Sequence, residues 1–170
     1  MSPPIPGEQT ARGYEPPINT QFSAFLDNRV GKLAELIEIF DGQSIQVVAL
    51  SIVDSTDHAV VRLVTTDGHK ARHLLRKHHI PYSEADILVV ELGVGQTLTT
   101  MCRHLLAAEI NIQYAFSLWV RPHGTATIAL HTDDQILASQ ILQRKGFSLL
   151  GENDLTDYPD MGDTYGHEDN

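Results

Sequence analysis

Two segments of the chain decide its fold: residues 45–67 read IQVVALSIVDSTDHAVVRLVTTD, and residues 112–134 read IQYAFSLWVRPHGTATIALHTDD. The match has an offset of 67 residues and continues without a gap to Leu88 and Leu155. Ten positions are identical, namely Ile45/Ile112, Gln46/Gln113, Val53/Val120, Ala59/Ala126, Leu63/Leu130, Thr65/Thr132, Asp67/Asp134, Ala71/Ala138, Leu75/Leu142 and Leu88/Leu155. Because apolar residues and turn residues recur together, the sequence predicts two repeats of one small unit.

The first repeat is predicted to contain a strand, a helix, a hairpin, a second helix and a last strand. The strand is expected over residues 21–26, and the hairpin over residues 45–53 and 59–66, where β-branched residues flank a turn-rich segment. Gly42 is expected to end the first helix, and Asp67 to cap the second. The apolar residues expected on the buried faces of these helices are Leu33, Leu36, Ile37, Phe40, Ala71, Leu74 and Leu75.

The second repeat is predicted to follow the same order. Its strands are expected over residues 87–92, 112–120, 125–131 and 147–150. Its helices should bury Leu98, Met101, Cys102 and Leu105, and then Ile141 and Leu142 after a start near Asp134. Two helices cover only one face of a four-stranded antiparallel sheet, so the predicted fold class is α+β, with two ferredoxin-like βαββαβ units packed side by side.

The expected organisation follows from the repeat and from composition. Residues 1–19 are proline-rich and predicted to form a flexible arm, residues 20–85 and 86–155 are the two domains, and residues 156–170 are predicted to form an acidic flexible tail. The net charge is −10, but residues 20–151 carry 11 basic and 13 acidic residues. Without a basic stripe there, we expect binding to neither nucleic acid nor an anionic membrane.

The single cysteine, Cys102, excludes an intramolecular disulfide framework and suits a reducing compartment. No segment approaches the roughly 20 apolar residues that a membrane-spanning helix needs. The sequence therefore predicts a cytoplasmic protein.

Two motifs resemble those of ACT domains. The stretch Asp27-Asn28-Arg29-Val30-Gly31-Lys32-Leu33 resembles the ACT loop Asn, any residue, Pro, Gly, any residue, Leu, except that Val30 replaces the proline. In the second repeat, Glu109-Ile110-Asn111-Ile112-Gln113-Tyr114 is similar to the ACT stretch Gly-Ile-Asn-Ile-Glu-Tyr. Together with the order of elements, the resemblance covers about residues 20–155.

The resemblance implies a regulatory protein that binds an amino acid, or a similar small zwitterion, at the interface of its two repeats and signals to a partner enzyme. In serine-responsive dehydrogenases of the family, the loop Asn of one domain and the second-strand Asn of its partner hold the ligand. Here the first repeat keeps Asn28 but has Ser44 at the strand position, whereas the second keeps Asn111 but has lost the loop motif over residues 93–97. One composite site is therefore implied, and its predicted residues are Asn28, Arg29, Val30, Gly31, Lys32, Ile110, Asn111, Ile112 and Gln113.

The residue types suit a zwitterion. A Gly-containing loop before a helix exposes backbone N–H groups to a carboxylate. The carboxamides of Asn28 and Asn111 offer a donor and an acceptor together. The plainer interpretation is that Asn28 shapes a turn and Asn111 caps a strand, since asparagine is common in turns.

Other sites are weaker. His69 and His73 stand at i and i+4, but a zinc site needs further ligands, so solvated histidines are the preferred interpretation. The segment Gly93-Val94-Gly95 lacks the third glycine of a dinucleotide fingerprint. We therefore expect neither a cofactor nor a metal, and no catalytic constellation is found.

Three further expectations remain open. The aromatic residues Tyr114, Phe116 and Trp119 would lie on both faces of one strand, and we expect the exposed face to favour a homodimer. A regulatory subunit of acetolactate synthase is one setting that the ACT resemblance allows. Two functions of other classes are an acylphosphatase, for which Arg29 is present after the first strand but the surrounding phosphate-binding motif is not, and a purely structural interaction module with degenerate effector sites.

Overall fold

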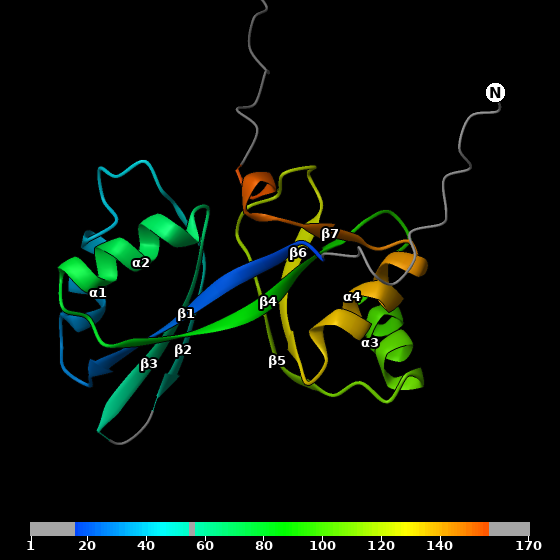
Figure 1. Cartoon of the computed structure of the whole chain (residues 1–170), viewed down its shortest axis with the longest axis horizontal. Helices are drawn as coiled ribbons and strands as arrows, with labels where there is room; N and C mark the ends of the chain where they lie inside the picture. The colour runs from blue at the N-terminus through cyan, green and yellow to red at the C-terminus, as the bar shows by residue number, and fades with distance from the viewer. Residues whose placement is uncertain (1–15, 55–56, 157–170) are drawn as a thin grey trace, which may run out of the picture.

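The computed structural model describes residues 16–54 and 57–156 and confirms the α+β fold class. Figure 1 shows a mostly antiparallel sheet with two pairs of helices. The first repeat contributes β1 (Ile18–Asp27), α1 (Lys32–Glu38), β2 (Val47–Asp54), β3 (His58–Thr65) and α2 (Gly68–Lys77). The chain continues with β4 (Tyr82–Leu92), α3 (Leu98–Ala107), β5 (Ile112–Ser117), β6 (Ala126–Thr132), α4 (Gln135–Arg144), β7 (Ser148–Leu150) and the 3-10 helix η1 (Glu152–Asp154).

The predicted flexible arm and tail fall almost entirely on residues 1–15 and 157–170, which lie outside the described residues. The last two residues of the predicted arm, Ile18 and Asn19, belong to β1. Asn19 is buried, and its side-chain amide donates a 2.8 Å hydrogen bond to the carbonyl of Leu150 at the end of β7. The ordered sheet therefore begins before residue 20.

One strand, β4, belongs to both repeats. Its first part pairs with β1, from Tyr82 opposite Ala24 to Leu88 opposite Ile18. Its last part pairs with β6 and also with β7, which gives the strand order β2-β3-β1-β4-β6-β5 with β7 beside β4. The fourth strand of the first repeat and the first strand of the second are thus continuous, and they cross the expected boundary between residues 85 and 86. Figure 1 shows β1 and β4 side by side through the middle of the molecule.

Each pair of helices covers a core of its own. Cross-strand partners share a face, so Phe22 on β1 lies on the same face as Leu88 on β4. Helices α1 and α2 pack over Phe22 and its neighbours, whereas α3 and α4 pack over Leu88 and its neighbours. Fully buried residues of these two cores include Phe22, Leu36, Leu63, Leu75, Leu88, Met101, Leu105 and Leu142.

A third core lies between the repeats, on the sheet face opposite to the helices. A β-bulge between Val47 and Ala49 releases Val48 from the ladder, and the Val48 carbonyl accepts a 3.1 Å hydrogen bond from the backbone N–H of Trp119. The sheet curls so that the β2 edge meets β5 and the segment that follows it. The members of this inter-repeat core are Val48, Ala49, Val64, Ile87, Val89, Leu118, Val120, Ala129, Leu150 and Leu155.

The second helix of each repeat agrees closely with its prediction. Ala71, Leu74 and Leu75 are buried in α2, and the side chain of Asp67 accepts a hydrogen bond from the N–H of Lys70 as its N-cap. Asp134 caps α4 in the same way.

The first helices differ from their predictions. Helix α1 ends at Glu38, before Gly42, so the buried Phe40 lies in the following turn. Leu33 and Leu98, predicted to be buried, are partly exposed because both stand in the first turn of their helices, beyond the cores.

The expected strand over residues 112–120 was too long. Strand β5 ends at Ser117, and Trp119 stands in an irregular segment rather than on the opposite face of a strand. The backbone hydrogen bond to Val48 draws this segment toward β2.

Candidate functional site

The loop predicted to bind a ligand lies at the end of β1. Its residues, all exposed or partly exposed, are Asn28, Arg29, Val30, Gly31 and Lys32. Gly31 has a φ of 90°, in the left-handed region that favours glycine, and it precedes the seven-residue helix α1. Glycine at position 31 thus allows the chain to turn from β1 into α1.

The two cationic side chains of this loop are paired with carboxylates close in the chain. Arg29 Nη2 lies 2.8 Å from Asp27 Oδ2, and Lys32 Nζ lies 2.6 Å from Glu35 Oε2. A ligand at this loop would compete with these neighbours for the two cations.

The predicted strand residues lie at the connection between α3 and β5. Ile110, Asn111 and Ile112 line a cavity of about 540 Å³ against α3. The backbone of Asn111 is fixed by Asp133, with a hydrogen bond of 3.1 Å in each direction. Gln113 is exposed where the register of β5 shifts.

The two predicted halves of the site are not brought together within one chain. Lys32 lines a separate cavity of about 320 Å³ beside Ile80 and Pro81, whereas Asn111 lines the cavity against α3. The composite site of Asn28 and Asn111 therefore stays a prediction.

In the second repeat, residues 93–97 form the loop that corresponds to residues 28–32, and the side chain of Gln96 occupies its hydrogen-bonding groups. Gln96 accepts a 2.8 Å hydrogen bond from the N–H of Gly93 and donates another of 2.8 Å to the carbonyl of Gly146. Thr97 and Thr100 form a capping box at the start of α3. These contacts satisfy donors that a ligand would otherwise meet.

A cavity of about 580 Å³ lies where the two repeats meet. The first repeat contributes the end of α1, the α1–β2 connection and β2, and the second contributes Trp119 and Val120. Its walls combine apolar and polar groups: Ile37, Phe40, Ile45, Val47 and Leu50 on one hand, and Asp41, Gln43 and Gln46 on the other. We call this the seam cavity.

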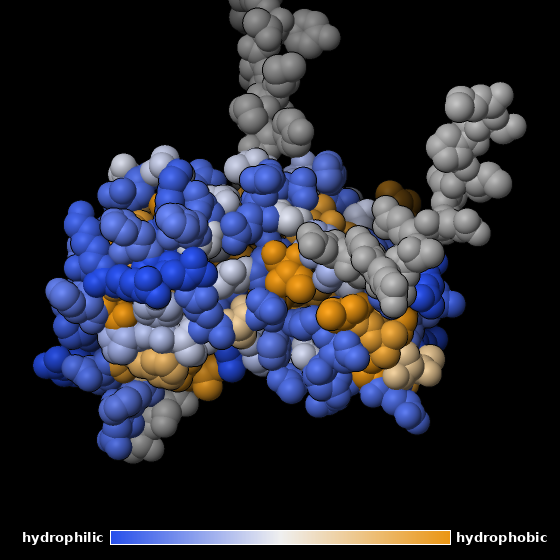
Figure 2. Space-filling model, in the orientation of Figure 1, coloured by the Kyte–Doolittle hydropathy of each residue, from blue (hydrophilic) through white to orange (hydrophobic). Residues whose placement is uncertain are grey.

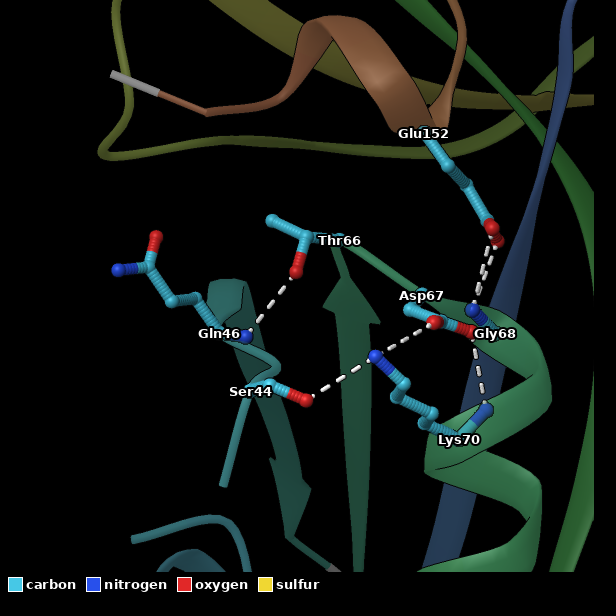
Figure 3. Close-up of polar contacts among 7 residues, drawn as sticks. All are labelled: Ser44, Gln46, Thr66, Asp67, Gly68, Lys70 and Glu152. Carbon is cyan, nitrogen blue, oxygen red and sulfur yellow. Dashed lines mark hydrogen bonds and ion pairs between the residues drawn. The ribbon is translucent and has the colours of Figure 1, made fainter. Parts of the chain in front are cut away.

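A smaller cavity of about 220 Å³ adjoins the seam cavity and shares Gln43 and Ile45 with it. It is also lined by Ser44, His69, Lys70, His73 and Leu74. Figure 3 shows Lys70 between Ser44 and Asp67: Nζ lies 3.0 Å from Ser44 Oγ and 3.4 Å from Asp67 Oδ2. The Lys70 ammonium is thus held beside Ser44, which corresponds to Asn111 of the second repeat.

Glu152 of η1, in the second repeat, contacts the start of α2 in the first repeat. Both carboxylate oxygens lie 3.1 Å from the backbone nitrogen of Gly68, the first residue of α2 (Figure 3). A carboxylate is stabilised there by the unpaired N–H and the positive end of the helix dipole. This contact joins residues that are 84 positions apart and fastens the end of the second repeat to the first.

The N-terminus of α2 is also held by Asp67. The backbone N–H of Lys70 donates to this carboxylate and lowers the pKa of Asp67, and the Lys70 ammonium adds to the effect. A lowered carboxyl pKa means that the contribution to stability is present above the ordinary aspartate pKa and is lost as pH falls through the lowered pKa. At neutral pH the cap is therefore fully formed.

Sequence reasoning missed the residues that line the seam. Gln43 and Lys70 were unremarkable polar residues, and Trp119 was expected on a regular strand. The available signal was divergence between the repeats, since Trp119, the single tryptophan, stands where the first repeat has Ile52.

Within residues 16–54 and 57–156, no group of three His, Cys, Asp or Glu residues is placed to hold a metal ion. None of the described helices combines the length and apolar character that crossing a membrane requires.

The chain matches the ACT domain pair family over residues 18–158, which confirms the resemblance predicted from the two motifs. It is similar to the crystal structure of protein BT0572 from Bacteroides thetaiotaomicron, with a TM-score of 0.73 and 25% identity over 82% of this chain and 96% of that one.

Two aspartate kinase regulatory subunits share the fold. The Thermus thermophilus subunit, in ligand-free form, has a TM-score of 0.52 and 12% identity over 74% of this chain and 91% of that one. The Thermus flavus subunit has a TM-score of 0.50 and 14% identity over 76% and 93%. A comparison with curated proteins finds no match.

Proposed function

Because this chain belongs to the ACT domain pair family, we propose that it is a non-catalytic regulatory protein that binds an amino acid, or a similar small zwitterion, at the interface of its repeats. The bound state is passed to a partner enzyme. The observation that carries this proposal is the seam cavity, which both repeats line and whose volume of about 580 Å³ suits a small molecule.

The chemistry around the seam fits the two charges of an amino acid. The ammonium of Lys70 and the hydroxyl of Ser44 offer donors for a carboxylate in the smaller adjoining cavity. Acceptors for an ammonium are Asp41 and the carboxamide oxygens of Gln43 and Gln46. The apolar wall formed by Phe40, Leu50 and Trp119 would receive an apolar side chain.

The first test is a thermal-shift screen of the twenty amino acids. A ligand that binds only the folded state raises its stability, by about 2.7 kcal/mol at a concentration one hundred times Kd. The matched pair Gln46→Ala and Gln113→Ala changes the same repeat position in each half. We expect Gln46→Ala to lose the shift, because Gln46 lines the seam cavity, and Gln113→Ala to keep it.

The outcomes of this screen show whether an amino acid binds and which site it occupies. A protein that none of the twenty amino acids stabilises contradicts the amino-acid sensor. A shift that survives in Gln46→Ala but disappears in Gln113→Ala moves the site from the seam cavity to the predicted strand 110–113.

The composite site of Asn28 and Asn111 has a separate test, because its halves would meet only between two chains. Neither Asn28→Ala nor Asn111→Ala alone should then bind. A mixture of the two variants should recover binding, since a mixed dimer contains one site in which both asparagines are intact. Isothermal titration calorimetry of each variant and of the refolded mixture measures ligand binding. A mixture that binds no ligand, like each variant alone, excludes a site between chains.

A second candidate function is a purely structural interaction module. The self-closed loop around Gln96 favours it, since that effector position of the second repeat is filled by the protein itself. Failure of every amino acid to stabilise the protein would support this module over the sensor.

A further inference from the structure

We infer that the sheet face opposite to the helices binds a small carboxylic acid with an apolar side group, and that Arg62 of β3 holds its carboxylate. This site is separate from the seam cavity, which Leu50 lines from the helix side of β2. The inference therefore goes beyond the proposed function and does not depend on it.

The inner surface of the curled sheet changes from apolar to polar along β2 and β3. Because the β2 edge meets β5, the face opposite to the helices turns inward, and Ala49 and Val64 of this face belong to the inter-repeat core. Strand residues two positions apart share a face, so Ser51 follows Ala49 there and Arg62 precedes Val64. The polar residues thus lie directly beside the core, at its open end.

Four polar residues form one cross-strand row at this level, which we call the polar row. Arg62 pairs with Ser51 of β2 and with Ser23 of β1, and Ser23 pairs in turn with Ser83 of β4. Direct partners of this kind have Cβ atoms about 5 Å apart. None of the four is buried, so a solute can reach them. The row offers one cation and three hydroxyl donors to an anion.

The guanidinium of Arg62 keeps its hydrogen-bonding capacity for such an anion. Its central carbon lies 3.9 Å from the centroid of the Tyr114 ring, a cation–π contact between the two repeats. Among the described side chains, none forms an ion pair with this guanidinium or accepts a hydrogen bond from it. A guanidinium carries five N–H donors, and its planar fork matches a carboxylate in bidentate geometry.

Tyr114 gives this cation a fixed support. The Tyr114 ring stacks on His131 with 4.9 Å between the ring centroids, and it packs against the inter-repeat core. His131 is held in turn, because its Nδ1 lies 2.8 Å from the carbonyl oxygen of Asp86. Arg62 is therefore placed by the second repeat, and a side chain that is already ordered loses less entropy when it binds a ligand.

Ser23 is oriented to assist Arg62. Gln21, which is buried two positions earlier on the same face, donates a 3.1 Å hydrogen bond from Nε2 to Ser23 Oγ. The Ser23 oxygen acts as the acceptor in this bond, so its own hydrogen is available to donate. A carboxylate beside Arg62 can accept that hydrogen bond from the direct cross-strand neighbour.

An apolar row, made of Val53, Val60 and Phe25, lies two residues beyond the polar row on the same face. Val53 is 41% exposed and Phe25 is 39% exposed. Figure 2 shows apolar surface at the lower left of the molecule, where Figure 1 places the ends of β1 and β2. Neither row contains a carboxylate that would repel an anion. An acid bound at Arg62 can therefore rest an apolar group on these side chains.

Isothermal titration calorimetry with 3-phenylpropionate tests the site, because this probe joins a carboxylate to an apolar ring. The unmodified full chain should bind the probe saturably at millimolar concentration and should not bind 3-phenylpropan-1-ol, which has the same ring without the charge. Arg62→Gln should abolish binding. Arg62→Lys should weaken binding about tenfold, because an ammonium keeps the charge but lacks the planar fork.

Two control variants locate the binding. Arg103→Gln removes an exposed arginine of α3, and Gln46→Ala alters the seam cavity, so both should bind the probe as the unmodified chain does. Circular dichroism checks that Arg62→Gln is folded; if it is not, the affinity of Arg62→Lys decides. An unmodified chain that does not bind the probe, equal binding of the alcohol, binding that persists in folded Arg62→Gln, or undiminished binding by Arg62→Lys would each overturn the inference.

Discussion

Leu155→Ala is expected to lower the free energy of unfolding by about 2 to 5 kcal/mol, the range for emptying a well-packed leucine site. Leu155 is completely buried although it follows the last strand, and it belongs to the core between the repeats. Its neighbours there include Val48, Val64 and Ile87 of the sheet. Removing its side chain leaves a cavity that these strands, fixed by their ladders, cannot fill.

Urea unfolding followed by circular dichroism measures this effect, with the slope of the transition unchanged. The control is Ile136→Ala, which shortens a side chain that is 57% exposed on α4 and should change stability by no more than about 0.5 kcal/mol. If Leu155→Ala and Ile136→Ala have equal effects, the C-terminal segment does not contribute to the inter-repeat core.

Gly68→Ala is expected to cost about 1 to 2 kcal/mol, because a charge-assisted hydrogen bond is lost while the helix gains a residue of better propensity. A Cβ at this position would lie 2.7 Å from Glu152 Oε1 and 3.3 Å from Thr20 Cβ. The carboxylate would have to leave the N–H of Gly68 that both of its oxygens contact. The hydrogen bond between the Glu152 carboxylate and this N–H therefore favours glycine at position 68.

A double-mutant cycle with Glu152→Ala isolates this contact. Once the carboxylate is absent, Gly68→Ala meets only the neighbouring Thr20 and should become neutral or mildly stabilising. The change of sign between the two backgrounds, read from urea unfolding, is the expected result. Equal costs in both backgrounds would show that Thr20, and not Glu152, sets the requirement for glycine.

Sequence reasoning succeeded where structure is decided locally. The N-cap Asp67, the start of α4 near Asp134 and the buried stripe of α2 depend on residues three or four positions apart, so local spacing predicts them. The α+β class and the order of elements were also predictable, because each helix and strand has its own periodic pattern and the second repeat shows the same order as the first. In the first helices, Leu33 and Leu98 failed the prediction because periodicity does not show where a core ends.

The seam was beyond such reasoning because its contacts join distant residues. Glu152 meets Gly68, and Trp119 meets Val48, only after the curled sheet has brought the repeats together. No local pattern marks Gln43 or Lys70 as residues that line a cavity. The motif residues Asn28 and Asn111 were found at the sequence level, but their separation within one chain depends on how the repeats dock.

Because β4 is continuous, the two repeats cannot be separated without breaking a strand. Ala85 pairs with Gln21, and Leu88 pairs with both Ile18 and Leu130, so one strand closes the first repeat and opens the second. A cut after residue 85 would leave each half with an unfinished sheet edge, and no linker separates them where a gene could be divided into two working domains. We expect the pair to fold cooperatively and to be inherited as a single unit.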